Sequence, residues 1–202
     1  IISHGKEIKM TREIKDGKLY FDGCDTTQLA TEYGTPLYVM SETDIIERFS
    51  QLRKEFTDKY PKTRVAYACK AFCNMAMLKL CEREGMCIDV VSGGELYTAI
   101  KAGFPAERIE FNGNNKLPEE LSAAIDYGIG RIIIDGIGEL ELIEKICREK
   151  NKKVKVLYRI TPGIKADSHD YIVTGKKDSK FGMPQDEDSL YREVKKALDS
   201  PY

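Results

Sequence analysis

The chain has 202 residues, of which 42% are hydrophobic and 32% are charged, and its formal net charge is −1. This composition is typical of a globular protein and excludes an intrinsically disordered chain. The balanced charge argues against binding to nucleic acid or to an anionic membrane, and no apolar run is long enough to cross a bilayer. No signal peptide is recognisable at the start of the sequence, so we expect a cytoplasmic protein.

The cysteines and histidines give little support for a metal site. Six cysteines are present, and their spacings match no zinc-binding pattern. Most of them lie in apolar segments, so we expect buried free thiols in a reducing compartment. The two histidines, His4 and His169, are far apart in the sequence. We therefore predict no metal site and no catalytic triad that depends on histidine.

The first predicted elements form a short N-terminal series. Residues 18–23 predict a strand, and residues 26–33 predict a short helix. Residues 35–41 predict an extended segment. Ser41 is a suitable N-cap for an amphipathic helix that we expect to run to about Lys59.

A regular repeat follows this series. Strand-like apolar segments recur at intervals of 22 or 23 residues. They begin near Val65, Cys87, Ile109, Arg131 and Val154. Amphipathic segments lie between them or after them, and these predict helices over residues 74–84, 94–102, 118–127, 138–150 and 189–198. Alternation of strands and helices at a fixed spacing predicts βαβ units and a parallel sheet.

Two α/β architectures fit this alternation, a doubly wound sheet and a TIM barrel. The regularity of the repeat favours the barrel, because a doubly wound sheet reverses its strand order at a switch point. No G-x-G-x-x-G motif follows the first strand of the repeat, which also argues against a dinucleotide-binding sheet. A complete barrel has eight strands. We therefore predict an incomplete barrel of about five βα units.

Polar residues interrupt the apolar pattern where the predicted strands end, which is where barrels place their functional groups. These residues are Lys70, Asp89, Glu95, Asp135 and Arg159, together with the polar segment 112–116, which ends with Lys116. An amine in an apolar strand is either a lysine that reaches to water or a lysine that can form a Schiff base. The others also have ordinary interpretations as caps, helix-dipole charges or surface residues. If the barrel prediction is correct, all of them converge on one mouth.

The segment over residues 162–182 is long and polar for a connection between a strand and a helix. Long loops of this kind are more often active-site lids than simple connectors. We therefore expect it to form a lid, and the alternative is a disordered surface loop.

Five motifs in this order resemble those of the fold-type III pyridoxal-phosphate enzymes, the group of alanine racemase and the ornithine and diaminopimelate decarboxylases. They are YACKAF (67–72), IDVVSGGEL (88–96), FNGNNK (111–116), YRITPG (158–163) and TGKKDSKFG (174–182). The last three are most similar to the diaminopimelate decarboxylase family. The resemblance covers about Leu19 to Tyr202, and it departs at Phe72, where many members have asparagine.

The resemblance implies a PLP-binding TIM barrel of the alanine racemase type, with pyridoxal 5'-phosphate as the cofactor. Lys70 would hold the cofactor, Asp89 and Glu95 would lie near the lysine and the ring, and Arg159 would lie near the hydroxyl side of the ring. The reaction would be decarboxylation of meso-2,6-diaminopimelate to L-lysine, a step of lysine biosynthesis. Members of the family are homodimers.

The resemblance also implies a domain organisation. Residues 1–35 would be an N-terminal segment that contributes a strand to a β-domain, and residues 36–202 would be part of the PLP-binding barrel. Most of the β-domain and several cofactor-binding motifs would follow Tyr202. We therefore expect these 202 residues to be inactive alone.

Two alternatives remain open. The same fold can act on another basic amino acid, such as ornithine or arginine, or on carboxynorspermidine. The chain can also be a non-catalytic homologue that binds pyridoxal phosphate. The presence of Lys70, Asp89 and Glu95 argues against the second alternative, because a protein that only binds the cofactor does not need acids around the lysine.

Overall fold

The computed structural model describes residues 11–162, 181–184 and 187–202. The chain forms two compact units, residues 1–63 and 64–202. The predicted boundary after residue 35 rests on the family resemblance rather than on compactness, and it stays a prediction. The predicted lid over residues 162–182 lies almost entirely outside the described residues.

The first unit is a small antiparallel sheet followed by two helices. Its elements are β1 (Arg12–Lys15), β2 (Lys18–Phe21), β3 (Cys24–Asp25), α1 (Thr26–Tyr33) and α2 (Glu42–Leu52), which continues as a π-helical turn over Arg53–Thr57. Asp25 caps α1 by accepting from the backbone N–H of Thr27 at 2.8 Å. Ser41 caps α2, as its position in the sequence predicts, by accepting from the N–H of Asp44 at 3.0 Å.

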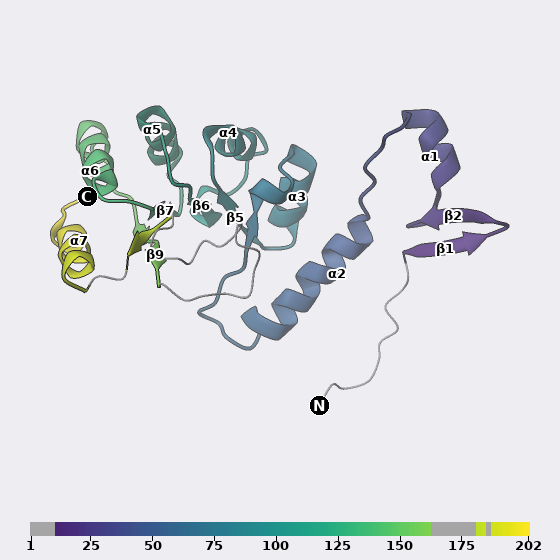
Figure 1. Cartoon of the computed structure of the whole chain (residues 1–202), viewed down its shortest axis with the longest axis horizontal. Coiled ribbons are helices and arrows are strands. Elements are labelled where there is room, and N and C mark those ends of the chain that lie inside the picture. The colour runs from purple at the N-terminus through teal and green to yellow at the C-terminus, as the bar shows by residue number, and fades with distance from the viewer. Residues whose placement is uncertain (1–10, 163–180, 185–186) are drawn as a thin grey trace. The chain divides into compact units, whose positions relative to one another are not determined.

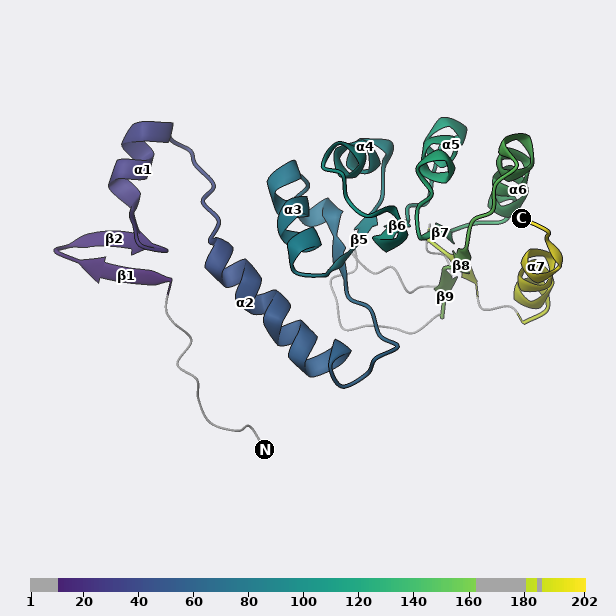
Figure 2. The same ribbon diagram turned by 180° about the vertical axis from the view of Figure 1, so that it is seen from behind.

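The second unit contains a five-stranded parallel sheet in which strand order follows chain order. The strands are β4 (Ala66–Ala68), β5 (Cys87–Val90), β6 (Ile109–Phe111), β7 (Arg131–Ile134) and β8 (Val156–Tyr158). The helices between them are α3 (Met75–Arg83), α4 (Gly93–Lys101), α5 (Pro118–Tyr127) and α6 (Glu139–Lys150). Both ribbon views show these helices in a row along one side of the sheet (Figures 1 and 2). The predicted fold class, an α/β partial barrel of about five βα units, is confirmed.

The core lies between the sheet and this row of helices. Alternate strand residues such as Ile88, Val90, Phe111 and Ile132 are fully buried. The residues between them, including Asp89 and Glu110, are only half-buried. The sheet therefore has one apolar face under the helices and one more polar face.

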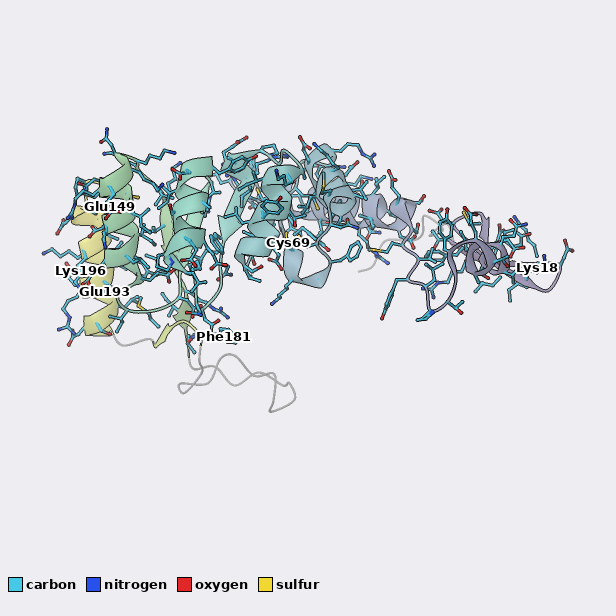
Figure 3. All side chains as sticks on the ribbon, turned by 90° about the horizontal axis from the view of Figure 1, so that it is seen from above. Lys18, Cys69, Glu149, Phe181, Glu193 and Lys196 are labelled. Carbon is cyan, nitrogen blue, oxygen red and sulfur yellow. The ribbon has the colours of Figure 1, made fainter. Side chains whose placement is uncertain are left out.

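The C-terminal part of the unit adds a short parallel pair and one more helix. They are β9 (Ile160–Thr161), β10 (Met183–Pro184) and α7 (Glu187–Asp199). Figure 3 labels Glu193 and Lys196, which form an ion pair of 2.7 Å on α7. Within the described residues, none of the helices has the length and hydrophobicity that crossing a bilayer requires.

The thiols largely match the sequence prediction. All six cysteines are free, and four of them are buried. These four are Cys69, Cys81, Cys87 and Cys147. Burial raises the pKa of each buried thiol, which makes it a poor nucleophile.

Candidate functional site

Lys70 lies in a turn at the carboxyl end of the first strand of the sheet. Strand β4 ends at Ala68, and Cys69–Ala71 form a single 3-10 turn. Lys70 is exposed, whereas its neighbour Cys69, labelled in Figure 3, is buried. The predicted strand, which ends at Lys70, therefore extends two residues past the end of β4. The amine lies at the edge of the sheet, where a ligand can reach it.

Asp89 lies on the neighbouring strand beside this turn. It is the register partner of Ala68, two residues before Lys70. Its Oδ1 atom is buried and has no hydrogen-bond partner among the described residues. Burial raises the pKa of Asp89, while hydrogen bonding to Asn112 and the charge of Lys70 act in the opposite direction. The structure thus brings Lys70 and Asp89 into one electrostatic environment.

Glu95 lies in the first turn of α4, directly after the same strand. Its Oε2 atom accepts a hydrogen bond of 2.7 Å from the backbone N–H of Val91. The Glu95 backbone N–H in turn donates to Ser92 Oγ, the N-cap of the helix, at 3.3 Å. The negative charge of Glu95 also contributes to the raised pKa of Asp89. Glu95 therefore lies in the same electrostatic environment as Lys70 and Asp89. Its hydrogen bond to the N–H of Val91 also stabilises the start of α4.

The start of α4 also receives a carboxylate from the next helix. Glu120 Oε1 accepts a hydrogen bond of 2.6 Å from the N–H of Gly93. Its Oε2 atom accepts one of 2.8 Å from Leu117, at the start of α5. A Cβ atom on Gly93 would lie 2.7 Å from Glu120 Oε1, so this glycine permits the close contact. The amino end of α4 is therefore occupied by the protein's own acid, and an anionic ligand would be repelled there.

Arg159 lies in a second cluster, directly after β8. Its Nη1 atom donates to Asp135 Oδ1 at 3.0 Å, and its guanidinium carbon lies 4.5 Å from the centre of the Phe181 ring. The other oxygen of Asp135 accepts from the backbone N–H of Gly182 at 3.0 Å. Asp135, which is 5% exposed, thus binds both sides of the short β9–β10 pair.

Comparison with known proteins shows where this arrangement belongs. Residues 42–200 match the pyridoxal-binding domain of the pyridoxal-dependent decarboxylases. The chain belongs to this family.

Diaminopimelate decarboxylase from Bacillus subtilis is a close relative, with 47% identity over 95% of this chain and 44% of the relative. The crystal structure of diaminopimelate decarboxylase from Methanocaldococcus jannaschii in complex with L-lysine superimposes with a TM-score of 0.84 and 40% identity. That match covers 96% of this chain and 45% of the solved chain. A lysine/ornithine decarboxylase from Vibrio vulnificus shares the fold at 19% identity, with a TM-score of 0.64. The chain spans less than half the length of these relatives.

The family implies pyridoxal phosphate. Lys70, Asp89 and Glu95 form a first cluster, and this cluster fits the end of the cofactor that carries the pyridine ring and the aldehyde. Lys70 offers an exposed amine to the aldehyde. Asp89 offers a buried oxygen that lacks a donor, and leaving such an atom unpaired costs about 1–3 kcal/mol. The phosphate end is different, because Glu120 already occupies the helix start nearest to Asp89. If a chain of this family binds the cofactor here, its phosphate must therefore be held away from this helix start.

Lys116 was predicted only as part of the polar end of the third strand, with no role of its own. Glu120 and Glu139 were not predicted as site residues, because each looks like an ordinary helix-start charge in the sequence. A signal was nevertheless present, because three helices carry a Glu-Leu pair in their first turn. Glu95, Glu120 and Glu139 each accept a backbone N–H from the preceding loop. Each following leucine is buried.

Proposed function

We propose that the complete protein carrying this chain converts meso-2,6-diaminopimelate to L-lysine, with pyridoxal phosphate held by Lys70. One observation supports this function above others. A lysine lies beside Asp89 and Glu95 at the carboxyl edge of a parallel sheet, in a chain that is 47% identical to diaminopimelate decarboxylase from Bacillus subtilis. The L-lysine complex of the Methanocaldococcus enzyme supports the identity of the product.

Bound pyridoxal phosphate supplies an electron sink for the carbanion that remains when a carboxylate leaves as carbon dioxide. The residues of this chain would prepare the site for that chemistry. The acids Asp89 and Glu95 lie beside Lys70 at the carboxyl edge of the sheet. Arg159, held by Asp135, places a second positive charge at the same edge of the sheet. We assign Arg159 to the hydroxyl side of the cofactor.

The remaining properties of the complete protein also belong to the proposal. The matched relatives are more than twice as long as this chain, so we infer that these residues supply the first part of the catalytic protein. We propose that they are inactive alone, that the complete protein is a homodimer, and that it acts in the cytoplasm. The amino-acid substrate is its small-molecule partner.

Reduction with borohydride tests the role of Lys70. Treatment of the complete protein with pyridoxal phosphate and borohydride should fix the cofactor on the peptide that contains Lys70, as read by mass spectrometry. Lys70→Ala should abolish release of carbon dioxide from meso-diaminopimelate. Lys79→Ala is a suitable control, because Lys79 lies on the outer helix α3 in an ion pair with Glu82. Labelling of another lysine, or turnover by Lys70→Ala, would refute the assignment.

A panel of substrates tests the specificity separately. Carbon dioxide release should be fastest with meso-diaminopimelate, and much slower with ornithine, arginine and carboxynorspermidine. A preference for one of these would keep the mechanism and replace the substrate. Labelling of Lys70 without decarboxylation of any of them would instead indicate a protein that only binds the cofactor.

A further inference from the structure

Lys116 is a buried cation between the two clusters. Its side chain is 1% exposed, although it follows the third strand of the sheet in a polar segment. The ammonium group donates to the carbonyl oxygens of Gly113 at 2.7 Å and Ile133 at 2.8 Å. It also lies 2.7 Å from Glu139 Oε1. The ammonium group therefore makes two hydrogen bonds and one ion pair.

Toward the first cluster, Lys116 acts through Gly113. This glycine has a φ of +109°, and a Cβ atom on it would lie 2.9 Å from the carbonyl oxygen of Val91. The loop after β6 is thus packed directly against the loop after β5. The N–H of Val91 is the one that Glu95 accepts. Lys116 therefore fixes the loop that supports Glu95.

Toward the second cluster, Lys116 acts through Glu139. The second oxygen of this carboxylate, Oε2, accepts a hydrogen bond of 2.9 Å from the backbone N–H of Asp135. The side chain of Asp135 in turn holds the guanidinium of Arg159 and the N–H of Gly182. A continuous series of polar contacts thus runs from Lys116 to Arg159.

We propose that the Lys116–Glu139 ion pair is a positioning device that fixes Arg159 relative to Lys70 and Asp89. This inference rests on the proposed function, because it takes these three residues as the groups that hold pyridoxal phosphate. Neither Lys116 nor Glu139 touches the cofactor in this assignment. Their role is to keep the loop that supports Glu95 at a fixed distance from the loop that carries Arg159. Residues of both loops can then contact the same rigid ring.

An ion pair this deep makes the arrangement sensitive to the loss of one partner. Removing one member of a buried pair leaves the other charge without compensation, whereas removing both charges together can be nearly neutral. In Glu139→Gln, the amide cannot present an oxygen to both Asp135 N–H and the ammonium group. In the double variant Lys116→Met/Glu139→Gln, the amide oxygen is free to accept from Asp135.

The test measures the dissociation constant for pyridoxal phosphate and the melting temperature of the cofactor-free complete protein. Lys116→Met and Glu139→Gln should each weaken binding about tenfold, as expected for one lost hydrogen bond to a charged group. The double variant should bind more tightly than either single variant. Lys150→Met is the control, because Lys150 pairs with Asp126 at 2.6 Å between α6 and α5, at the ends of these helices that lie opposite the site. It should lower the melting temperature and change the dissociation constant less than twofold.

The outcomes separate this inference from the proposed function. If borohydride labels Lys70 but Lys116→Met and Glu139→Gln bind the cofactor as the unaltered protein does, the positioning role is wrong. It is equally wrong if Lys150→Met weakens binding as much as they do, since the effect would then be general destabilisation. If Lys116→Met does not fold, the comparison of Glu139→Gln with the double variant decides, and equal or weaker binding by the double variant would overturn the proposal.

Discussion

Asp89 lies in an environment that disfavours its charged form, beside the turn that carries Lys70. Its carboxylate is partly withdrawn from water, and one of its oxygens has no partner among the described residues. Nearby acids add to the difficulty, and only Asn112 and Lys70 offset it. A carboxylate in this environment destabilises the cofactor-free protein. Its unpaired oxygen can accept a hydrogen bond from a ligand. Raised pKa values of this origin are common in functional sites.

Asp89→Asn should stabilise the cofactor-free protein at neutral pH and weaken its binding of pyridoxal phosphate. The pKa of Asp89 is raised in the folded state, so the folded chain binds more protons than the unfolded chain over the interval above the ordinary value of 3.8. The free energy of unfolding therefore falls as the pH rises through this interval. Asparagine removes that loss, and the melting temperature at neutral pH should rise, with no gain at pH 3.

Asp126→Asn provides a control of opposite sign. Ion pairs with Lys150 and Lys152 lower the pKa of Asp126, so its charge stabilises the folded state at neutral pH. The melting temperature of this variant should fall slightly. If Asp89→Asn also lowers the melting temperature at neutral pH, the carboxylate is not the source of destabilisation that we infer.

The site residues differ in how visible they are in the sequence. Lys70 and Asp89 interrupt apolar segments, which is the signal that the sequence prediction uses. Lys116 is one of several polar residues after the third strand, and Glu139 is a glutamate at a helix start, which is common on surfaces, so neither is marked as buried. Their burial depends on the sheet bringing β6 and β7 together, and no local pattern reports that contact.

The strands and helices of the repeat were predicted closely because their spacing is regular. Helix α5 has the predicted bounds, and the five strands of the sheet begin within two residues of the expected positions. Strand β1 was missed, since REIK lacks the alternation of apolar and polar residues that marks a half-buried strand. Its four residues are all exposed, so neither face of this strand requires apolar residues.

Gly130 shows how tightly the connection between two βα units is built. A Cβ atom on this residue would lie 2.4 Å from the carbonyl oxygen of Glu107. Its N–H donates to the carbonyls of Ala106 at 2.8 Å and Ile109 at 3.0 Å. Backbone must therefore move if a side chain is added at the start of β7.

Gly130→Ala should lower the free energy of unfolding by about 1–3 kcal/mol, the usual cost of adding atoms to a closely packed site. Gly136→Ala is the matched control, because a Cβ atom there meets nothing within 4 Å and its φ is not positive. Urea denaturation of both variants measures the difference. Equal stability of the two would show that the backbone around Gly130 adjusts without cost.

At the scale of the whole molecule, the cofactor site that we propose around Lys70 lies on a sheet of five parallel strands. A closed barrel needs eight strands, and its inner face is filled by layers of side chains. In this sheet the more polar face carries Asp89, Glu110 and Leu157, which is 45% exposed. Surface of this kind is usually covered in a finished protein.

The isolated 202-residue chain should therefore retain little pyridoxal phosphate. Glu120 occupies the start of α4, so a phosphate group cannot bind there. The described residues therefore provide contacts only for the ring of the cofactor. Gel filtration followed by measurement of cofactor absorbance would compare this chain with the complete protein. Stoichiometric retention by the isolated chain would show that it already contains a full set of cofactor contacts.

Glu120 has a consequence for how these proteins can be recombined. Its two oxygens bind Gly93 in one βα unit and Leu117 in the next, so the two units share one side chain. A hybrid with a junction between α4 and α5 would inherit Gly93 from one parent and the acid from another. Any parent with a larger residue at position 93, or without an acid at position 120, would leave a clash or an unpaired N–H at the edge that bears Asp89. The units that repeat along this barrel are therefore not interchangeable modules, and a successful exchange must keep α4 and the start of α5 together.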